Sequence, residues 1–131
     1  MITLTKDMET GVPLIDSQHR ELVDRINAVT AMGTKSTSVE ETKRTLDLLG
    51  NYIVTHFNDE EELQKKAGYP KYKEHQAQHK YYINEFQKLK QEFEKNGSSP
   101  KFTLELSNSI IAWIVRHIKS EDVALGKFLS I

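Results

Sequence analysis

Four stretches of this chain carry apolar side chains at alternating intervals of three and four residues, which places them along one face of a helix. The helical pattern covers about residues 17–32, 39–66, 71–95 and 102–120, with a short further piece at 123–130. Short connections between long helices favour antiparallel neighbours. The sequence therefore predicts an all-α fold, a single domain over residues 1–131 built as an antiparallel, up-down-up-down four-helix bundle.

Capping signals mark several of the expected helix ends. Asp16 is a candidate N-cap of the first helix, and Ser38 with Glu41 forms an S-x-x-E capping box before the second. Gly33 and Gly68 follow the first two periodic stretches, where a glycine commonly ends a helix.

Composition excludes several functional classes. The chain has 18 basic and 19 acidic residues, so its net charge of −1 gives no electrostatic reason to bind nucleic acid or an anionic membrane. It contains no cysteine, which excludes disulfides, iron–sulfur clusters and thiolate zinc sites. No apolar run is long enough to span a bilayer, and no signal peptide is recognisable. We expect a cytoplasmic protein without membrane insertion.

All the histidines of the chain fall on these apolar stripes, and so does one glutamate. The residues are His19, His56, His75, His79, His117 and Glu60. The stripes of a bundle face its central axis, and a buried ionised carboxylate costs several kcal/mol unless it is paired or binds a metal. No lysine or arginine lies on the stripes to pair with it. Imidazole and carboxylate groups are ligands of iron, zinc and manganese, so we predict a metal site in the core that holds a pair of ions.

The spacing of these residues tests that prediction. His56 and Glu60 are four residues apart and share a helix face, as do His75 and His79. For His117 the periodicity favours Glu121, because a regular helix turns Asp122 about 140° away. Asp122 can contribute only if the helix ends, tightens or bulges before it. At this point, zinc and a hydrogen-bonded histidine cluster remain alternatives to iron.

The ligand set also bears on the chemistry. Carboxylate-rich di-iron bundles use Glu-x-x-His motifs, and none occurs here. A histidine-rich pair of ferrous ions can give one electron per iron to O2 and recover it on release. Seven protein ligands and one bridging oxygen leave an open position on two six-coordinate irons. Phe57 and Trp113 neighbour ligand positions and are expected to wall the pocket.

The chain resembles the hemerythrin family, in its single-domain bacterial form. The resemblance covers nearly the whole chain. It rests on residues 15–22 (IDSQHREL), 56–61 (HFNDEE), 68–70 (GYP) with the His75-x3-His79 pair, and 113–118 (WIVRHI) with Asp122.

This resemblance implies a non-haem di-iron centre with an oxo or hydroxo bridge. One iron would take His75, His79 and His117. The other would take His19 and His56 and keep a vacant position for O2. Two carboxylates, Glu60 and Asp122, would bridge the irons. The resemblance thus favours Asp122 over Glu121, and implies that the fourth helix is distorted before Asp122.

The function that the resemblance implies is reversible O2 binding by a carrier, store or scavenger rather than an enzyme. We expect a monomer that delivers O2 to an oxidase. The alternatives are an O2- or redox-sensing module, a di-iron peroxide or nitric oxide reductase, and a bundle with zinc or a structural iron pair. The family often has an aromatic residue before the first helix and a methionine at position 64. This chain has Leu4–Met8 and Gln64 there.

Overall fold

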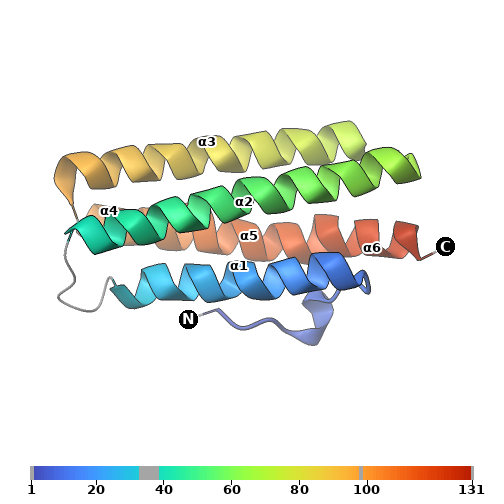
Figure 1. Cartoon of the computed structure of the whole chain (residues 1–131), viewed down its shortest axis with the longest axis horizontal. Coiled ribbons are helices and arrows are strands. Elements are labelled where there is room, and N and C mark those ends of the chain that lie inside the picture. The colour runs from blue at the N-terminus through green and yellow to red at the C-terminus, as the bar shows by residue number, and fades with distance from the viewer. Residues whose placement is uncertain (1, 33–38, 98, 131) are drawn as a thin grey trace.

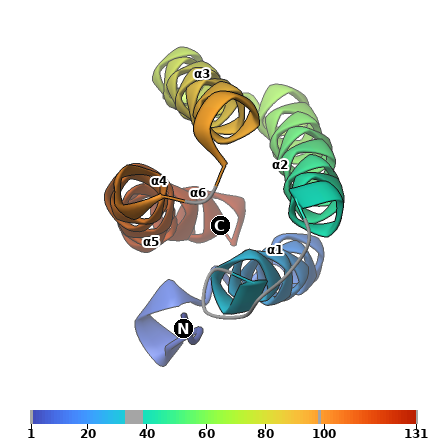
Figure 2. The ribbon, with the colours of Figure 1, turned by 90° about the vertical axis from the view of Figure 1, so that its left-hand side faces the viewer.

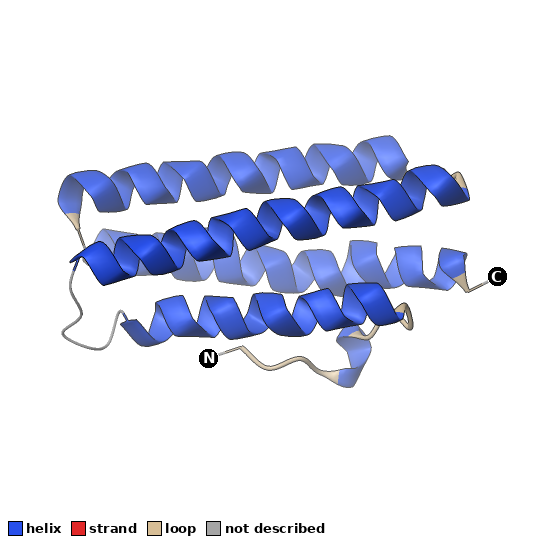
Figure 3. Cartoon of the chain, viewed as in Figure 1, coloured by secondary structure: helices blue, strands red, loops and turns tan. Residues whose placement is uncertain are grey.

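The computed structural model describes residues 2–32, 39–97 and 99–130. The predicted roles of Gly33 and Ser38 therefore lie outside the described residues. Within them the chain forms helices and connecting turns without a strand (Figure 3).

Four antiparallel rods surround a central axis (Figures 1 and 2). The first three are α1 (Pro13–Met32), α2 (Val39–Ala67) and α3 (Tyr72–Asn96). The fourth rod is a continuous run of five helical segments, namely α4 (Pro100–Glu105), η2 (Leu106–Ile111), α5 (Ala112–His117), η3 (Ile118–Asp122) and α6 (Val123–Leu129). The predicted all-α, antiparallel four-helix bundle is confirmed. Among the described helices, none is long and apolar enough to cross a membrane.

The first helix begins one turn earlier than the Asp16 signal predicts. Its first residue is Pro13, a favourable residue there because the first helical N–H has no partner within the helix. The Asp16 carboxylate instead holds the preceding turn. Its Oδ1 accepts hydrogen bonds from Thr10 N (2.9 Å) and Thr10 Oγ1 (2.7 Å), and its Oδ2 accepts one from Gly11 N (3.1 Å).

The second helix ends at Ala67, and Gly68 follows it directly. The N–H of Tyr69 donates to the Gln64 carbonyl (3.0 Å), and that of Gly68 to the Lys65 carbonyl (3.3 Å). Gly68 has φ +67°, a backbone conformation that strongly favours glycine. These two hydrogen bonds and the backbone conformation of Gly68 direct the chain into α3, which carries two of the histidines.

Two π-helical segments, η2 and η3, interrupt the fourth rod. A π turn takes one residue more than an α turn, so it changes which residues share a face. Segment η3 lies between His117 and Asp122 and brings the carboxylate onto the face of the histidine. The distortion that the resemblance implies is therefore present.

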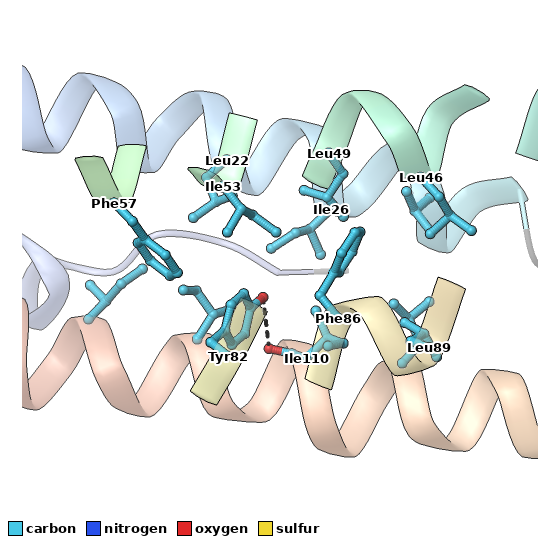
Figure 4. Close-up of a cluster of buried hydrophobic side chains, with 14 of the residues drawn as sticks. Leu22, Ile26, Leu46, Leu49, Ile53, Phe57, Tyr82, Phe86, Leu89 and Ile110 are labelled. Atoms are coloured by element: carbon cyan, nitrogen blue, oxygen red, sulfur yellow. Dashed lines mark hydrogen bonds between the residues drawn. The ribbon is translucent and has the colours of Figure 1, made fainter. Parts of the chain in front are cut away.

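Two apolar clusters fill the bundle. The main cluster includes Leu22, Ile53, Phe57, Tyr82, Phe86, Ile110, Ile114 and Ile118, all nearly inaccessible to solvent (Figure 4). The Tyr82 hydroxyl faces the Ile110 carbonyl of η2 at 3.5 Å. The end cluster is smaller and contains Ile15, Tyr69 and Leu125. His19 lies between Ile15 of the end cluster and Leu22 of the main cluster, and Asp122 lies between Ile118 of the main cluster and Leu125 of the end cluster.

The segment before α1 packs against the start of that helix and the end of the fourth rod. It contains η1 (Lys6–Met8), whose Met8 is only 3% exposed and belongs to the main cluster. Asp7 pairs with Lys119 at 3.5 Å. A Cβ at Gly126 would lie 2.1 Å from the Thr10 carbonyl oxygen, so the close packing of this segment on α6 requires glycine. Met8 thus fills a buried position in the region where the family often has an aromatic residue.

Candidate metal centre

The structure brings all seven predicted site residues together in the core. They are His19 on α1, His56 and Glu60 on α2, His75 and His79 on α3, His117 on α5 and Asp122 at the end of η3. None is more than 3% exposed. Their donor atoms form two groups that share both carboxylates, and within each group the atoms lie within 4.8 Å of one another. One group contains three histidines, His75, His79 and His117, and the other contains His19 and His56.

Each carboxylate divides its two oxygens between the two groups. Glu60 Oε1 lies 2.8 Å from His75 Nε2 and 3.2 Å from His79 Nε2, while Glu60 Oε2 lies 3.6 Å from His56 Nε2. Asp122 is arranged in the same way, with Oδ1 3.0 Å from His75 Nε2 and Oδ2 3.0 Å from His19 Nε2. His117 Nε2 is 3.3 Å from Asp122 Oδ1. This arrangement would allow both carboxylates to bridge a pair of cations.

The orientation of these groups suits metal binding better than hydrogen bonding. The carboxylate oxygens of Glu60 and Asp122 are buried and make no hydrogen bond of acceptable geometry, although imidazole nitrogens lie close by. The Nε2 atoms of His75 and His117 face each other at 3.0 Å. Lone pairs that converge in this way would be costly in a dry core without a cation between them. The five imidazoles and two carboxylates therefore fit a pair of iron ions.

Three of the histidines have the ring tautomer fixed by a side-chain acceptor. The Nδ1 of His56 donates to Gln18 Oε1 (2.8 Å), and that of His117 to Gln78 Oε1 (2.9 Å). An amide oxygen can only accept, so the proton must be on Nδ1, and the Nε2 lone pair is free for a metal. The Nδ1 of His79 similarly lies 3.0 Å from Glu61 Oε2. Such partners orient ligand rings and raise their basicity.

The acceptors of these histidines are functional residues that the sequence pattern did not reveal. Gln18, Gln78 and Glu61 lie next to the apolar stripes rather than on them. Gln18 also donates to Asp59 Oδ2 at 2.8 Å. Asp59, through Gln18, and Glu61, through His79, therefore both support the site. The sequence offered one signal for these acceptors: each is directly adjacent in the sequence to a histidine or to the buried Glu60.

The environment shifts the pKa of two histidines in opposite directions. Burial lowers the pKa of His56 to about 4, because it disfavours the charged ring more than Glu60 favours it. Burial also opposes charge on His75, but the adjacent negative carboxylates of Asp122 and Glu60 outweigh it and raise the pKa of His75 to about 10.

The two carboxyls titrate at low pH. Burial alone would raise the pKa of Asp122, but the charge of His117 and the close imidazoles of His19 and His75 hold it well below its usual range. Burial and the charge of Asp122 raise the pKa of Glu60, yet the close imidazoles of His75 and His79 lower it overall. Both carboxyls are ionised at neutral pH, as metal binding requires.

Aromatic rings wall the three-histidine side, as predicted for Phe57 and Trp113. Phe57 stacks on His79 with ring centroids 3.8 Å apart and an interplanar angle of 3°. Trp113 stacks on His117 at 4.6 Å and 12°. These contacts hold the imidazole planes in place.

Gln64 lies one turn beyond Glu60 on α2 and is fully buried. Neither its amide nitrogen nor its amide oxygen has a hydrogen-bond partner among the described residues. This polar side chain occupies the position at which the family often has methionine. It places a strong dipole one helical turn from the Glu60 carboxylate.

Comparison with known proteins agrees with this geometry. The family profile described as "Hemerythrin HHE cation binding domain" matches residues 10–129. A bacteriohemerythrin of Methylococcus capsulatus is 29% identical over 124 residues, which cover 92% of this chain and 90% of the relative. A bacteriohemerythrin of Stenotrophomonas maltophilia is 28% identical over 118 residues, which cover 90% of this chain and 74% of the relative.

Solved structures are similar as well. The crystal structure of a wild-type hemerythrin superposes with a TM-score of 0.86 at 27% identity, and the match covers 100% of this chain and 99% of that one. Together with the histidine–carboxylate cluster, these relatives support an iron site of the hemerythrin type. The chain belongs to the hemerythrin family.

Proposed function

We propose that this chain is a single hemerythrin domain that binds O2 reversibly at a non-haem di-iron centre. It would act as a carrier, store or scavenger of O2 rather than as an enzyme. His75, His79 and His117 would hold one iron, and His19 and His56 the other. Glu60 and Asp122 would bridge them. The bacteriohemerythrin relatives support this function.

The observation that carries the proposal is the unequal donor count around two shared carboxylates. Glu60 and Asp122 each place one oxygen beside histidines of the three-histidine group and the other beside a histidine of the two-histidine group. The two-histidine side is one protein donor short of the three-histidine side, so an exogenous ligand can bind there. When bound, a pair of ferrous ions would supply the two electrons that O2 takes up and returns.

The protein's own residues protect that position. His19 and His56 are at most 1% exposed, and the main cluster covers them with Leu22 and Ile53 one turn away on the same helices. On the side of Leu22 and Ile53, this apolar packing limits access of water and protons, which would drive irreversible oxidation. Gln18 holds the His56 ring with its Nε2 toward the carboxylates. Reversibility therefore depends on exclusion of solvent more than on an acid or base.

The direct test is an absorption spectrum of the reduced, iron-loaded protein before and after exposure to O2. We expect about two irons per chain, near-UV charge-transfer bands that appear with O2, and their loss under vacuum. The cycle should repeat without loss of iron. The His75→Ala variant should contain less than the full iron complement and serves as a control for the site.

Three outcomes would contradict the proposal. A colourless protein that contains zinc would indicate a structural metal site. Bands that persist under vacuum would indicate irreversible oxidation. Rapid turnover of peroxide or nitric oxide by the same protein would identify a reductase instead.

A further inference from the structure

One side of the metal centre reaches the surface through an aromatic ring. Trp113 lies one turn before His117 on α5 and stacks on its imidazole with centroids 4.6 Å apart and planes within 12°. His117 is buried, whereas Trp113 is partly exposed. The indole lines a surface pocket of about 250 Å³ together with Gln78, Arg116, His117 and Ser120. Two stacked rings therefore connect this pocket with the three-histidine group.

The other histidines lack such a connection among the described residues. Phe57 stacks on His79 but is only 1% exposed and lies inside the main cluster. Tyr69 meets His75 edge-on with centroids 6.5 Å apart and belongs to the end cluster. His19 lines a second pocket, of about 410 Å³, but no aromatic side chain lines it. Trp113 thus combines a stacked contact to a site histidine with access to solvent.

The position of the Trp113 indole is fixed by a buried neighbour on α3. Tyr82, which is fully buried, stacks on Trp113 with centroids 4.4 Å apart and an interplanar angle of 30°. Gln78, which lines the pocket, accepts a hydrogen bond from His117 Nδ1. The rings therefore keep their contact without a rearrangement when a molecule binds in the pocket. The rate of electron tunnelling falls steeply with each through-space gap between atoms. Two rings that are already stacked therefore favour electron transfer.

The other lining groups define what the pocket could bind. Arg116 is exposed, and no acidic side chain pairs with it among the described residues. A guanidinium next to an aromatic face suits an aromatic molecule that carries a phosphate or carboxylate. The Gln78 amide and the Ser120 hydroxyl offer polar contacts at the edge.

We propose that this pocket is an electron-input site, where a small aromatic one-electron donor with an anionic group, such as reduced flavin mononucleotide, passes electrons through Trp113 and His117 to ferric iron. The inference rests on the proposed iron centre. In each step the flavin loses one electron and one ferric ion becomes ferrous. The proton of the flavin leaves to solvent, and no covalent bond to the protein forms. Two steps return an oxidised centre to the state that binds O2.

The first test compares two exposed arginines, each next to a site histidine. Air-oxidised, iron-loaded protein is mixed with photoreduced flavin mononucleotide, and the loss of the near-UV bands is followed by stopped flow. Arg116→Gln should slow reduction about tenfold, because it removes the attraction to the phosphate. Arg20→Gln, beside His19, is the matched control and should leave the rate unchanged. With reduced riboflavin, which has no phosphate, Arg116→Gln should have little effect.

The second test removes the indole. Trp113→Leu should slow reduction by both flavins at matched iron content. Binding is read separately from the quenching of flavin fluorescence when oxidised flavin mononucleotide is titrated with the protein. Quenching should be lost in Trp113→Leu and weakened in Arg116→Gln, and it should be retained in Arg20→Gln.

The outcomes separate this inference from the proposed function. A protein that binds O2 reversibly but is reduced at the wild-type rate in both Arg116→Gln and Trp113→Leu overturns the electron-input site alone. Equal slowing by Arg20→Gln and Arg116→Gln also overturns it. A protein without a di-iron spectrum contradicts both proposals.

Discussion

The second helix and the fourth rod each give one histidine and one shared carboxylate to the same site, but they use different backbones. On α2, His56 and Glu60 are four residues apart in a regular helix. On the fourth rod, His117 and Asp122 are five residues apart, and the π-helical segment η3 takes up the extra residue. A spacing of five residues therefore places two side chains on the same face when a π turn accommodates the additional residue, as a spacing of four does in a regular α-helix. Spacing alone predicts a ligand pair only where the helix is regular.

The largest effect should come from single-residue deletions, which act oppositely in the two rods. Asn58 and Ser120 are both exposed and lie between the histidine and the carboxylate. Deletion of Asn58 turns Glu60 and the rest of α2 by about 100° and should abolish iron binding. Deletion of Ser120 should convert η3 to an α turn and leave Asp122 facing the site. Iron content after anaerobic reconstitution measures the difference. Equal loss of iron in both deletions would refute this account of η3.

The second-largest effect should distinguish Asp122 from Glu121 as the carboxylate of η3 that binds iron. Asp122→Ala removes a bridging group and should reduce iron from about two per chain to less than one. Glu121→Ala changes a partly exposed neighbour and should leave the iron content intact. Iron analysis with a colorimetric chelator decides between them. The reverse result would mean that the regular periodicity, and not the π segment, governs the ligand.

A smaller effect is expected from the acceptors that orient the histidines of these two rods. Gln18→Leu removes the acceptor of His56, and Gln78→Leu that of His117. Each should weaken iron binding by about 10–100-fold. Gln18→Leu should have the larger effect, because the two-histidine group has fewer donors and Gln18 also binds Asp59. Competition with a chelator gives the affinities, with Gln91→Leu on the exposed face of α3 as the control. Unchanged affinities would mean that packing alone orients the rings.

The smallest effect is the pH dependence of the metal-free protein. The lowered pKa of each carboxyl adds stability above the unfolded pKa of about 4, and this stability is lost as the pH falls through the folded pKa. The pKa of His56, lowered to about 4, also removes stability as the pH falls below about 6.5. The raised pKa of His75 acts on the alkaline side, where its stabilisation is lost as the pH rises from about 6.5 to about 10.

The two bridging carboxyls should differ in this dependence. Asp122 is held well below its usual pKa, and Glu60 is lowered as well. We therefore expect Asp122→Asn to flatten the acid limb of the stability curve more than Glu60→Gln does. Urea unfolding between about pH 3 and pH 7 measures both variants. A steeper acid limb in Asp122→Asn would contradict the assignment.

The stripes on the four rods were sufficient to predict the bundle and the burial of all five histidines, because burial follows from periodicity. Periodicity could not predict η2, which has no ligand in it and no sequence signal that we recognise. It favoured Glu121 over Asp122, and only the family resemblance pointed to Asp122.

Other features depend on contacts between segments distant in the sequence. The start of α1 at Pro13 was missed because Asp16 has the residue type of an N-cap, yet it binds the turn at Thr10 and Gly11. Gln18 and Gln78 were missed because each reaches a histidine on another rod, 38 and 39 residues away in the sequence. A helix pattern shows which side chains point inward, but not which of their neighbours touch across the bundle.

Gly126, in the last helix of the fourth rod, is in close contact with Thr10, in the segment before α1. This contact lies next to Asp122 of the site. Thr10 is tied to Asp16 on α1, and Gly126 lies one turn after Asp122 on the fourth rod. Any tag, truncation or fusion that pulls on the first ten residues would therefore strain the side of the site where His19 meets Asp122. A biosensor built on this fold should carry its reporter at the α3–α4 connection, at the opposite end of the bundle (Figure 1).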